Sequence, residues 1–246
     1  MKRTRAVLAV PLLAVPALVT ACVPDVPPGP GPSTTTSTTS TTTTVAPRHV
    51  MDVGHADVVE VTVDGASLKV QIKDDSRLAA PGVVWREPDE TILRVKGGPG
   101  PQGAQTTVPN PAGAYAFLGT PGSSVWLLPQ VQNGNLLWPG LSTERIPAGV
   151  LAGNTVNWVV DSVVGPGSFH LYNTNAFGTP SVKFTSNSPW PQTYATPTGV
   201  HSHFTWAFGA LGTYTLTFRA TATLADGTAV TSGPVPYTFV VGDLPA

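Results

Sequence analysis

Apolar and polar residues alternate in many short segments of the chain, and this pattern predicts β-strands. The clearest case is residues 59–63 (VEVTV), an Asp-Gly pair at 64–65, and residues 67–72 (SLKVQI), which together predict a hairpin. Similar alternation occurs at 92–95, 125–128, 155–160, 169–172, 181–184, 214–218 and 237–241. No longer segment has helical periodicity, and prolines interrupt every candidate helix. We therefore expect an all-β fold, a single large immunoglobulin-like or jelly-roll-type β-sandwich over residues 48–246.

The segment 201–208 (HSHFTWAF) combines two histidines with an aromatic row. Residues two apart in a strand share a face, so His201 and His203 point the same way. The alternate positions hold the aromatic row: Phe204, Trp206 and Phe208. We expect this row to face the core and the two histidines to lie on the other face. Two imidazoles a few ångströms apart suit a borderline metal such as zinc or copper.

A second ligand-rich segment, residues 49–57 (HVMDVGHAD), lies at the start of the expected domain. Its glycine at 54 permits a bend, so we expect the segment to fold over the sandwich face and close a site. His49 and His55 are its candidate nitrogen ligands, and Asp52 or Asp57 would add an oxygen, with Asp52 as our choice. The sequence thus predicts a metal site built by His49, His55, His201, His203 and Asp52, with zinc as the metal. The alternative is a chance grouping of four surface histidines, and we expect the lone His170 to be structural.

The first 47 residues have the features of a secretion signal followed by a spacer. Residues 1–21 have a basic start, an apolar run too short to span a bilayer, and small residues at the end, the layout of a secretory signal peptide. The only cysteine, Cys22, follows directly, as in the lipobox of bacterial lipoproteins, and it is the predicted lipidation site. Residues 22–47 are rich in Pro, Ser and Thr and predict a disordered stalk. We expect a cell-membrane protein, lipid-anchored on the extracytoplasmic face.

Composition narrows the classes of function. The 246 residues include 13 Lys or Arg and 14 Asp or Glu, only 11% charged residues, so the clustered basic surplus that nucleic acid requires is missing. One cysteine rules out every cysteine-cluster metal site. The sequence has no Gly-x-Ser-x-Gly or His-Glu-x-x-His motif, and its Gly-x-Gly-x-x-Gly match at 98–103 contains two prolines. We therefore expect a protein that is not an enzyme.

Several segments together resemble one family. They are 49–61 (HVMDVGHADVVEV), 114–119 (AYAFLG), 125–139 (VWLLPQVQNGNLLWP), 141–149 (LSTERIPAG), 199–208 (GVHSHFTWAF) and 212–227 (GTYTLTFRATATLADG). They are similar to the choice-of-anchor M domain of actinobacterial surface-anchored proteins, and the resemblance covers nearly all of 48–241. It implies a surface location and, because some members are encoded beside ABC transporters of the metal-uptake type, a part in handling a metal outside the cell. The family's histidines correspond to His49, His55, His201 and His203.

Two non-metal functions remain open at this point. Trp85, Trp138 and Trp190 lie in or beside proline-rich turns, where indole rings can stack on sugars, which suits a cell-wall glycan-binding or adhesion module. A structural surface protein without any ligand is the other alternative.

Overall fold

The computed structural model describes residues 48–245, and within them nearly all regular structure is β. Three short 3₁₀ helices interrupt the strands: η1 (Pro88–Glu90), η2 (Gly113–Leu118) and η3 (Ala152–Asn154). The predicted all-β, sandwich-like fold is confirmed. None of the helices in residues 48–245 has the length and apolar character needed to cross a membrane. The predicted signal peptide, the lipidation site Cys22 and the stalk lie outside the described residues.

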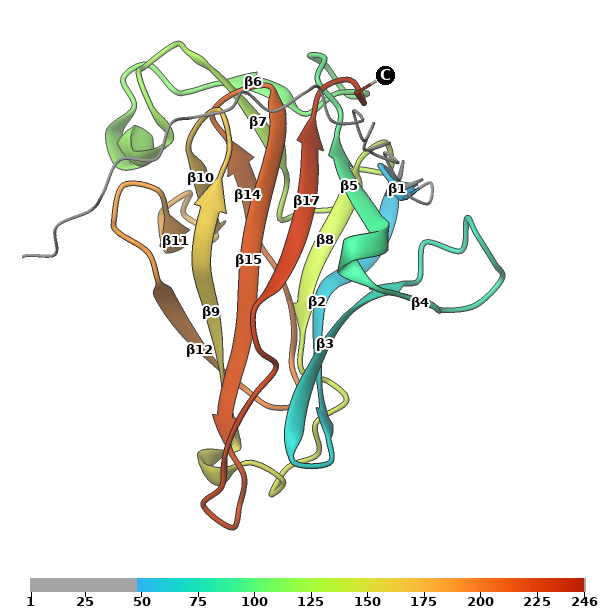
Figure 1. Cartoon of the computed structure of the whole chain (residues 1–246). Coiled ribbons are helices and arrows are strands. Elements are labelled where there is room, and N and C mark those ends of the chain that lie inside the picture. Colours follow the sequence, from blue (N-terminus) through green and yellow to red (C-terminus); the bar gives the residue numbers. More distant parts are fainter. Residues whose placement is uncertain (1–47, 246) are drawn as a thin grey trace, which may run out of the picture. The chain divides into compact units, whose positions relative to one another are not determined.

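The strands form three sheets (Figure 1). Sheet A has the order β1 (His49–Met51), β5 (Thr91–Val95), β17 (Val235–Val241), β15 (Gly212–Thr223), β9 (Thr155–Val164) and β12 (Gln192–Pro197), with β16 (Ala229–Thr231) also paired to β15. Sheet B has the order β13 (His201–His203), β8 (Leu137–Ser142), β2 (Gly54–Asp64), β3 (Ser67–Asp74) and β4 (Val84–Arg86). Sheet C has the order β11 (Pro180–Thr185), β10 (Phe169–Thr174), β14 (Thr205–Phe208), β7 (Ser124–Leu128) and β6 (Gln105–Thr107).

One hydrophobic core joins the three sheets. The aromatic row predicted from the alternation is buried, since Trp206 and Phe208 have no exposed surface and Phe204 has 2%. The Trp206 ring lies 5.3 Å from that of Phe239 on β17, so sheet C packs directly on sheet A. Val59 and Val61 of sheet B belong to the same buried cluster.

The predicted hairpin between β2 and β3 is present. Asp64 pairs with Ser67 across the β2–β3 hairpin, and Gly65 in the turn has φ +57°, a left-handed conformation that glycine adopts without steric cost. Tyr214 at the start of β15 has the geometry of a tyrosine corner. Its hydroxyl donates to the carbonyl oxygen of Ala210 and accepts from the amide of the same residue, both at 3.0 Å.

Strand β8 was not predicted, because Trp138-Pro139-Gly140 has the composition of a turn. In the structure this segment is the strand between β13 and β2. Pro139 has no amide hydrogen to donate, but its carbonyl oxygen accepts hydrogen bonds from Trp206 Nε1 at 3.3 Å and from His203 Nδ1 at 3.2 Å. Side chains therefore tie this strand to β13 and β14.

Two of the points at which the chain passes from one sheet to another bear on the histidines. Between β1 and β2 it leaves sheet A for sheet B, with Gly54 at φ +88° where β2 begins. At Phe204, between β13 and β14, it leaves sheet B for sheet C. His201 and His203 are therefore in sheet B, while most of the aromatic row that follows is in sheet C.

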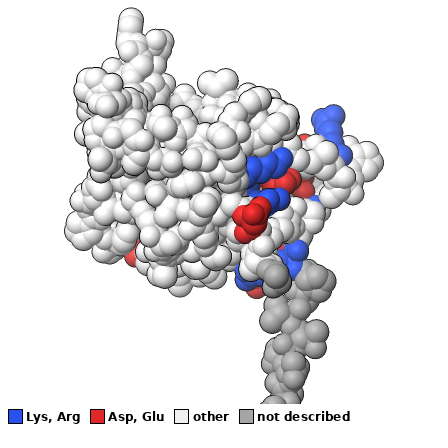
Figure 2. Space-filling model, turned by 90° about the horizontal axis from the view of Figure 1, so that it is seen from above, with Lys and Arg blue, Asp and Glu red and all other residues white. Residues whose placement is uncertain are grey.

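Charged residues are distributed unevenly over the fold. The chain has no Asp, Glu, Lys or Arg between Lys96 and Glu144, and Lys183 is the only one from 162 to 218. All five strands of sheet C fall in these two stretches. Figure 2 shows one face on which most of the surface is uncharged and the charged side chains gather on one side. Charged partners for a histidine are thus available in sheet B and almost lacking in sheet C.

Candidate metal site

The candidate site lies on one face of sheet B, above strand β8, which is between β13 and β2. On one side of β8, His55 is opposite Trp138 and Asp57 is opposite Gly140 in the β2 register. On the other side, His203 is opposite the same Gly140 in the β13 register. Because residues two apart share a face, both flanking strands present their polar side chains above Gly140.

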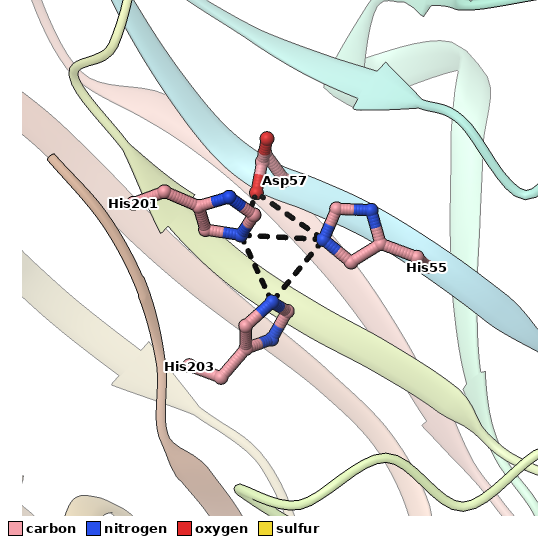
Figure 3. A group of neighbouring side chains, drawn as sticks. All are labelled: His55, Asp57, His201 and His203. Carbon is pink, nitrogen blue, oxygen red and sulfur yellow. Dashed lines mark hydrogen bonds and ion pairs between the residues drawn. The ribbon is translucent and has the colours of Figure 1, made fainter. Parts of the chain in front are cut away.

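Four side chains converge there: His55, Asp57, His201 and His203 (Figure 3). The three histidine Nε2 atoms form a triangle with sides of 2.9, 3.1 and 3.2 Å. Asp57 Oδ1 lies 2.9 Å from His201 Nε2 and 3.7 Å from His55 Nε2. All four atoms lie within 4.8 Å of one another.

The three contacts between these Nε2 atoms cannot all be hydrogen bonds. A neutral imidazole nitrogen is either a donor or an acceptor, so at least one of three mutual contacts joins two donors or two acceptors. Asp57 Oδ1, which has no exposed surface, accepts no hydrogen bond from the described residues. A cation at the centre would attract all three nitrogen lone pairs and this oxygen together.

The geometry fits a tetrahedral metal ion. Bonds of about 2.0–2.1 Å to nitrogen and oxygen place the ligand atoms of a tetrahedral site about 3.3 Å apart. Five of the six separations, 2.9–3.7 Å, bracket that distance, and the sixth, between His203 and Asp57, is longer but within 4.8 Å. Zinc binds histidine nitrogen and Asp or Glu oxygen, so the donors also match by type.

Gly140 has no side chain, and the ligand side chains occupy the space that a side chain would fill. A Cβ atom at this position would lie 2.6 Å from Asp57 Oδ1, 3.0 Å from His201 Nε2 and 3.1 Å from His203 Cε1. Any other residue would push these ligands apart, so the cluster requires a residue without a side chain at this position of β8.

The other ring nitrogen of each histidine faces an oxygen. His55 Nδ1 contacts Asp75 Oδ1, His203 Nδ1 lies 3.2 Å from the Pro139 carbonyl oxygen, and His201 Nδ1 lies 3.8 Å from Glu144 Oε2. A hydrogen on Nδ1 leaves the Nε2 lone pair free to bind a metal, and outer-sphere oxygens commonly fix ligating histidines in this way. The Trp138 ring stacks on that of His203, with centroids 3.7 Å apart and planes 9° apart, and this limits its rotation.

Charges around the cluster favour an ionised Asp57 and a neutral His203. Burial favours the neutral carboxyl, but His201 and Lys73 outweigh it and lower the pKa of Asp57. The interaction with Asp57 raises the pKa of His201 above its ordinary value. Burial, followed by the charges of His201 and His55, lowers the pKa of His203 to about 4.

The structure separates two of the five predicted ligands from this group. His49 lies on β1 in sheet A, whereas His55 lies on β2 in sheet B, because the chain changes sheets between them. Asp52 lies in that connection, where its Oδ2 is 3.8 Å from Arg94 and 3.7 Å from Lys96. The expectation that His49 and Asp52 share the site is therefore corrected, and Asp57 is the carboxylate that joins the histidines.

The sequence does contain a signal that could have identified Asp57 as a ligand. It is two residues after His55 on the same strand, the spacing that placed His201 and His203 on one face. His170, expected to be structural, is 1% exposed on β10 in sheet C, and its Nδ1 lies 2.8 Å from Thr185 Oγ1.

The three tryptophans considered for sugar stacking lie in different settings. Trp138 is half-buried beside the cluster, and Trp190 packs against the core. Trp85 is 41% exposed, with the Arg145 guanidinium 4.4 Å above its ring. Binding of a cell-wall glycan stays a prediction.

In comparisons with known proteins, no family model, no curated protein and no solved structure matches the chain. The resemblance to the choice-of-anchor M domain stays a prediction.

Proposed function

We propose that the chain binds a zinc-like divalent ion through His55, Asp57, His201 and His203. The observation that carries the proposal is the convergence of three Nε2 atoms and one buried carboxylate oxygen above Gly140. The oxygen partners of the Nδ1 atoms support it, since they leave the converging nitrogens free to ligate.

We further propose that this binding is not catalytic. Catalytic zinc sites keep three protein ligands and an open position for water or substrate, whereas structural sites are closed by four. The cluster offers four protein ligand atoms, which favours holding an ion over activating water.

The place of action that we propose is the extracytoplasmic face of the cell membrane, with a lipid anchor on Cys22. The basic and apolar start of the chain, the small residues before Cys22 and the Pro/Ser/Thr-rich stretch after it support this location. The resemblance to the choice-of-anchor M domain adds a partner, a metal ABC uptake system. The ion would then be cargo.

Calorimetric titration with zinc at neutral pH tests the binding. The protein should bind one zinc ion per chain, and the double variant His201→Ala, His203→Ala should bind none. His49→Ala is the matched control, because it removes a histidine outside the cluster and should bind like the unaltered protein. Equal heats from all three proteins, or none from any, would refute the proposal.

Mass spectrometry of the protein extracted from membranes tests the anchor. The mature chain should begin at Cys22 and carry diacylglycerol, and a Cys22→Ala variant should leave the membrane fraction. An unlipidated chain that retains Met1 would refute the anchor without touching the metal proposal.

A further inference from the structure

The two oxygens of Asp57 have different partners. Oδ1 faces His55 and His201, whereas Oδ2 lies 3.0 Å from the ammonium of Lys73. Lys73 is opposite Asp57 in the β2–β3 register, on the side away from β8. Asp57 on β2 therefore directs Oδ1 toward the histidines, while Lys73 on the neighbouring strand β3 engages Oδ2.

Lys73 is itself held in place. Its ammonium lies 3.5 Å from Glu144 Oε2, and that same oxygen lies 3.8 Å from His201 Nδ1. The side chain of Lys73 is 20% exposed, so it runs along the sheet rather than into solvent. Contacts between Asp57 and Lys73, Lys73 and Glu144, and Glu144 and His201 thus form a network along one side of the cluster.

A carboxylate whose second oxygen is engaged binds a metal through one oxygen only. Hard ions such as calcium take six to eight oxygen ligands and often use both oxygens of a carboxylate, and magnesium and manganese prefer six. Zinc accepts four. On the side of β8, a Cβ at Gly140 would already lie 2.6–3.1 Å from atoms of the ligand side chains, so a further ligand cannot enter from that side.

We infer that Lys73 is a positioning residue that restricts Asp57 to one ligand oxygen, and that it thereby makes the site select four-coordinate ions over six-coordinate ones. This inference rests on the proposed function. It assigns the selectivity to a residue that does not touch the ion.

Cobalt(II) is a suitable probe, because its visible absorption is intense in a tetrahedral site and weak at higher coordination number. The full chain, Lys73→Met and Lys73→Gln are titrated with cobalt alone. The unaltered protein should give the intense spectrum. Lys73→Met frees Oδ2 and should lower the intensity several-fold, while Lys73→Gln keeps a neutral hydrogen-bond donor and should retain it.

Competition between zinc and manganese for the site is a second test of the role of Lys73. The ratio of zinc affinity to manganese affinity should fall by about tenfold in Lys73→Met, the lower end of what outer-sphere changes cause. A change that only loosened the fold would weaken both ions alike and leave the ratio unchanged.

The outcomes separate this inference from the proposal beneath it. Failure of the unaltered protein to bind cobalt or zinc overturns both. A folded Lys73→Met variant that keeps the intense spectrum, or that binds no cobalt, overturns the role of Lys73 alone. If Lys73→Met does not fold, X-ray absorption of the zinc-loaded unaltered protein decides: four ligands at about 2.0–2.1 Å support the inference, and five or six overturn it.

Discussion

His203 in sheet B and His170 in sheet C have the same lowered pKa in very different surroundings. Burial alone lowers the pKa of His170 to about 4, whereas at His203 burial acts together with two neighbouring histidines. His170 has one polar contact, to Thr185, and its Nε2 has no hydrogen-bond partner among the described residues. The Nε2 of His203 points at two other nitrogens.

The difference shows what turns a buried histidine into a candidate ligand. A low pKa reports only that the imidazole is neutral, which both residues share. Converging lone pairs and carboxylates that orient the rings exist only in sheet B, because sheet C has a single charged residue, Lys183. The same sandwich thus contains one histidine with a single polar contact and three histidines whose ring nitrogens converge.

The largest effect that separates the two regions is stabilisation by zinc. At a zinc concentration about 1,000 times the dissociation constant, binding to the folded state adds about 4 kcal/mol to the free energy of unfolding. His201→Ala, His203→Ala should lose this increment, and His170→Gln should keep it. Urea unfolding with zinc and with chelator measures the increment in each variant. Loss of the increment in His170→Gln would contradict the claim that only the histidines of sheet B bind the ion.

The pH dependence of stability gives the next effect, and it concerns His170. Its pKa is about 4 when folded and near 6.5 when unfolded, so the unfolded chain binds more protons between these values. The contribution of neutral His170 is full above pH 6.5 and is lost as the pH falls toward 4, on the order of 3 kcal/mol.

Urea unfolding in chelator at several pH values measures this loss. His170→Gln should have a flatter profile than the unaltered protein between pH 6.5 and 4. Some slope should remain, because His203 titrates in the same range. Identical profiles would show that His170 is protonated without cost in the fold.

Gly140→Ala tests the room above β8. The new Cβ would lie 2.6 Å from Asp57 Oδ1, so this ligand must move away from the histidines. We expect zinc affinity to fall by about 10–100-fold, as for changes next to ligating residues. Gly134→Ala is the matched control, since a Cβ there meets no atom within 4 Å. Equal calorimetric affinities for the two variants would contradict the packing.

The smallest effect is expected from Asp75→Asn. The amide keeps an acceptor oxygen for His55 Nδ1 but loses the negative charge, so zinc affinity should fall by about tenfold. Asp52→Asn removes a charge outside the cluster and should leave the affinity unchanged. A larger loss from Asp52→Asn than from Asp75→Asn would move the site toward β1.

Much of the fold could be predicted from the sequence because its signals are local. The Asp64-Gly65 turn and the aromatic row at 204–208 depend only on neighbouring residues, and both are present. Strand β8 could not be predicted in this way. Proline and glycine at 139–140 indicate a turn, and what makes them a strand is the pairing with β2 and β13, far away in the chain.

The candidate site was predictable in part for the same reason. The two-residue spacing of His201 and His203 placed them on one face. That they meet His55 and not His49 depends on the sheet change before Gly54, which no local pattern encodes. Asp57 could have been preferred to Asp52 by its spacing from His55, whereas the role of Gly140 appears only when three strands lie side by side.

Anomalous diffraction at the zinc edge from zinc-soaked crystals tests most directly whether these side chains hold an ion. One peak should appear about 2.0–2.1 Å from the Nε2 atoms of His55, His201 and His203, with Asp57 Oδ1 as the fourth ligand. A peak beside His49 and Asp52, or no peak in fully soaked crystals, would contradict the metal site on sheet B.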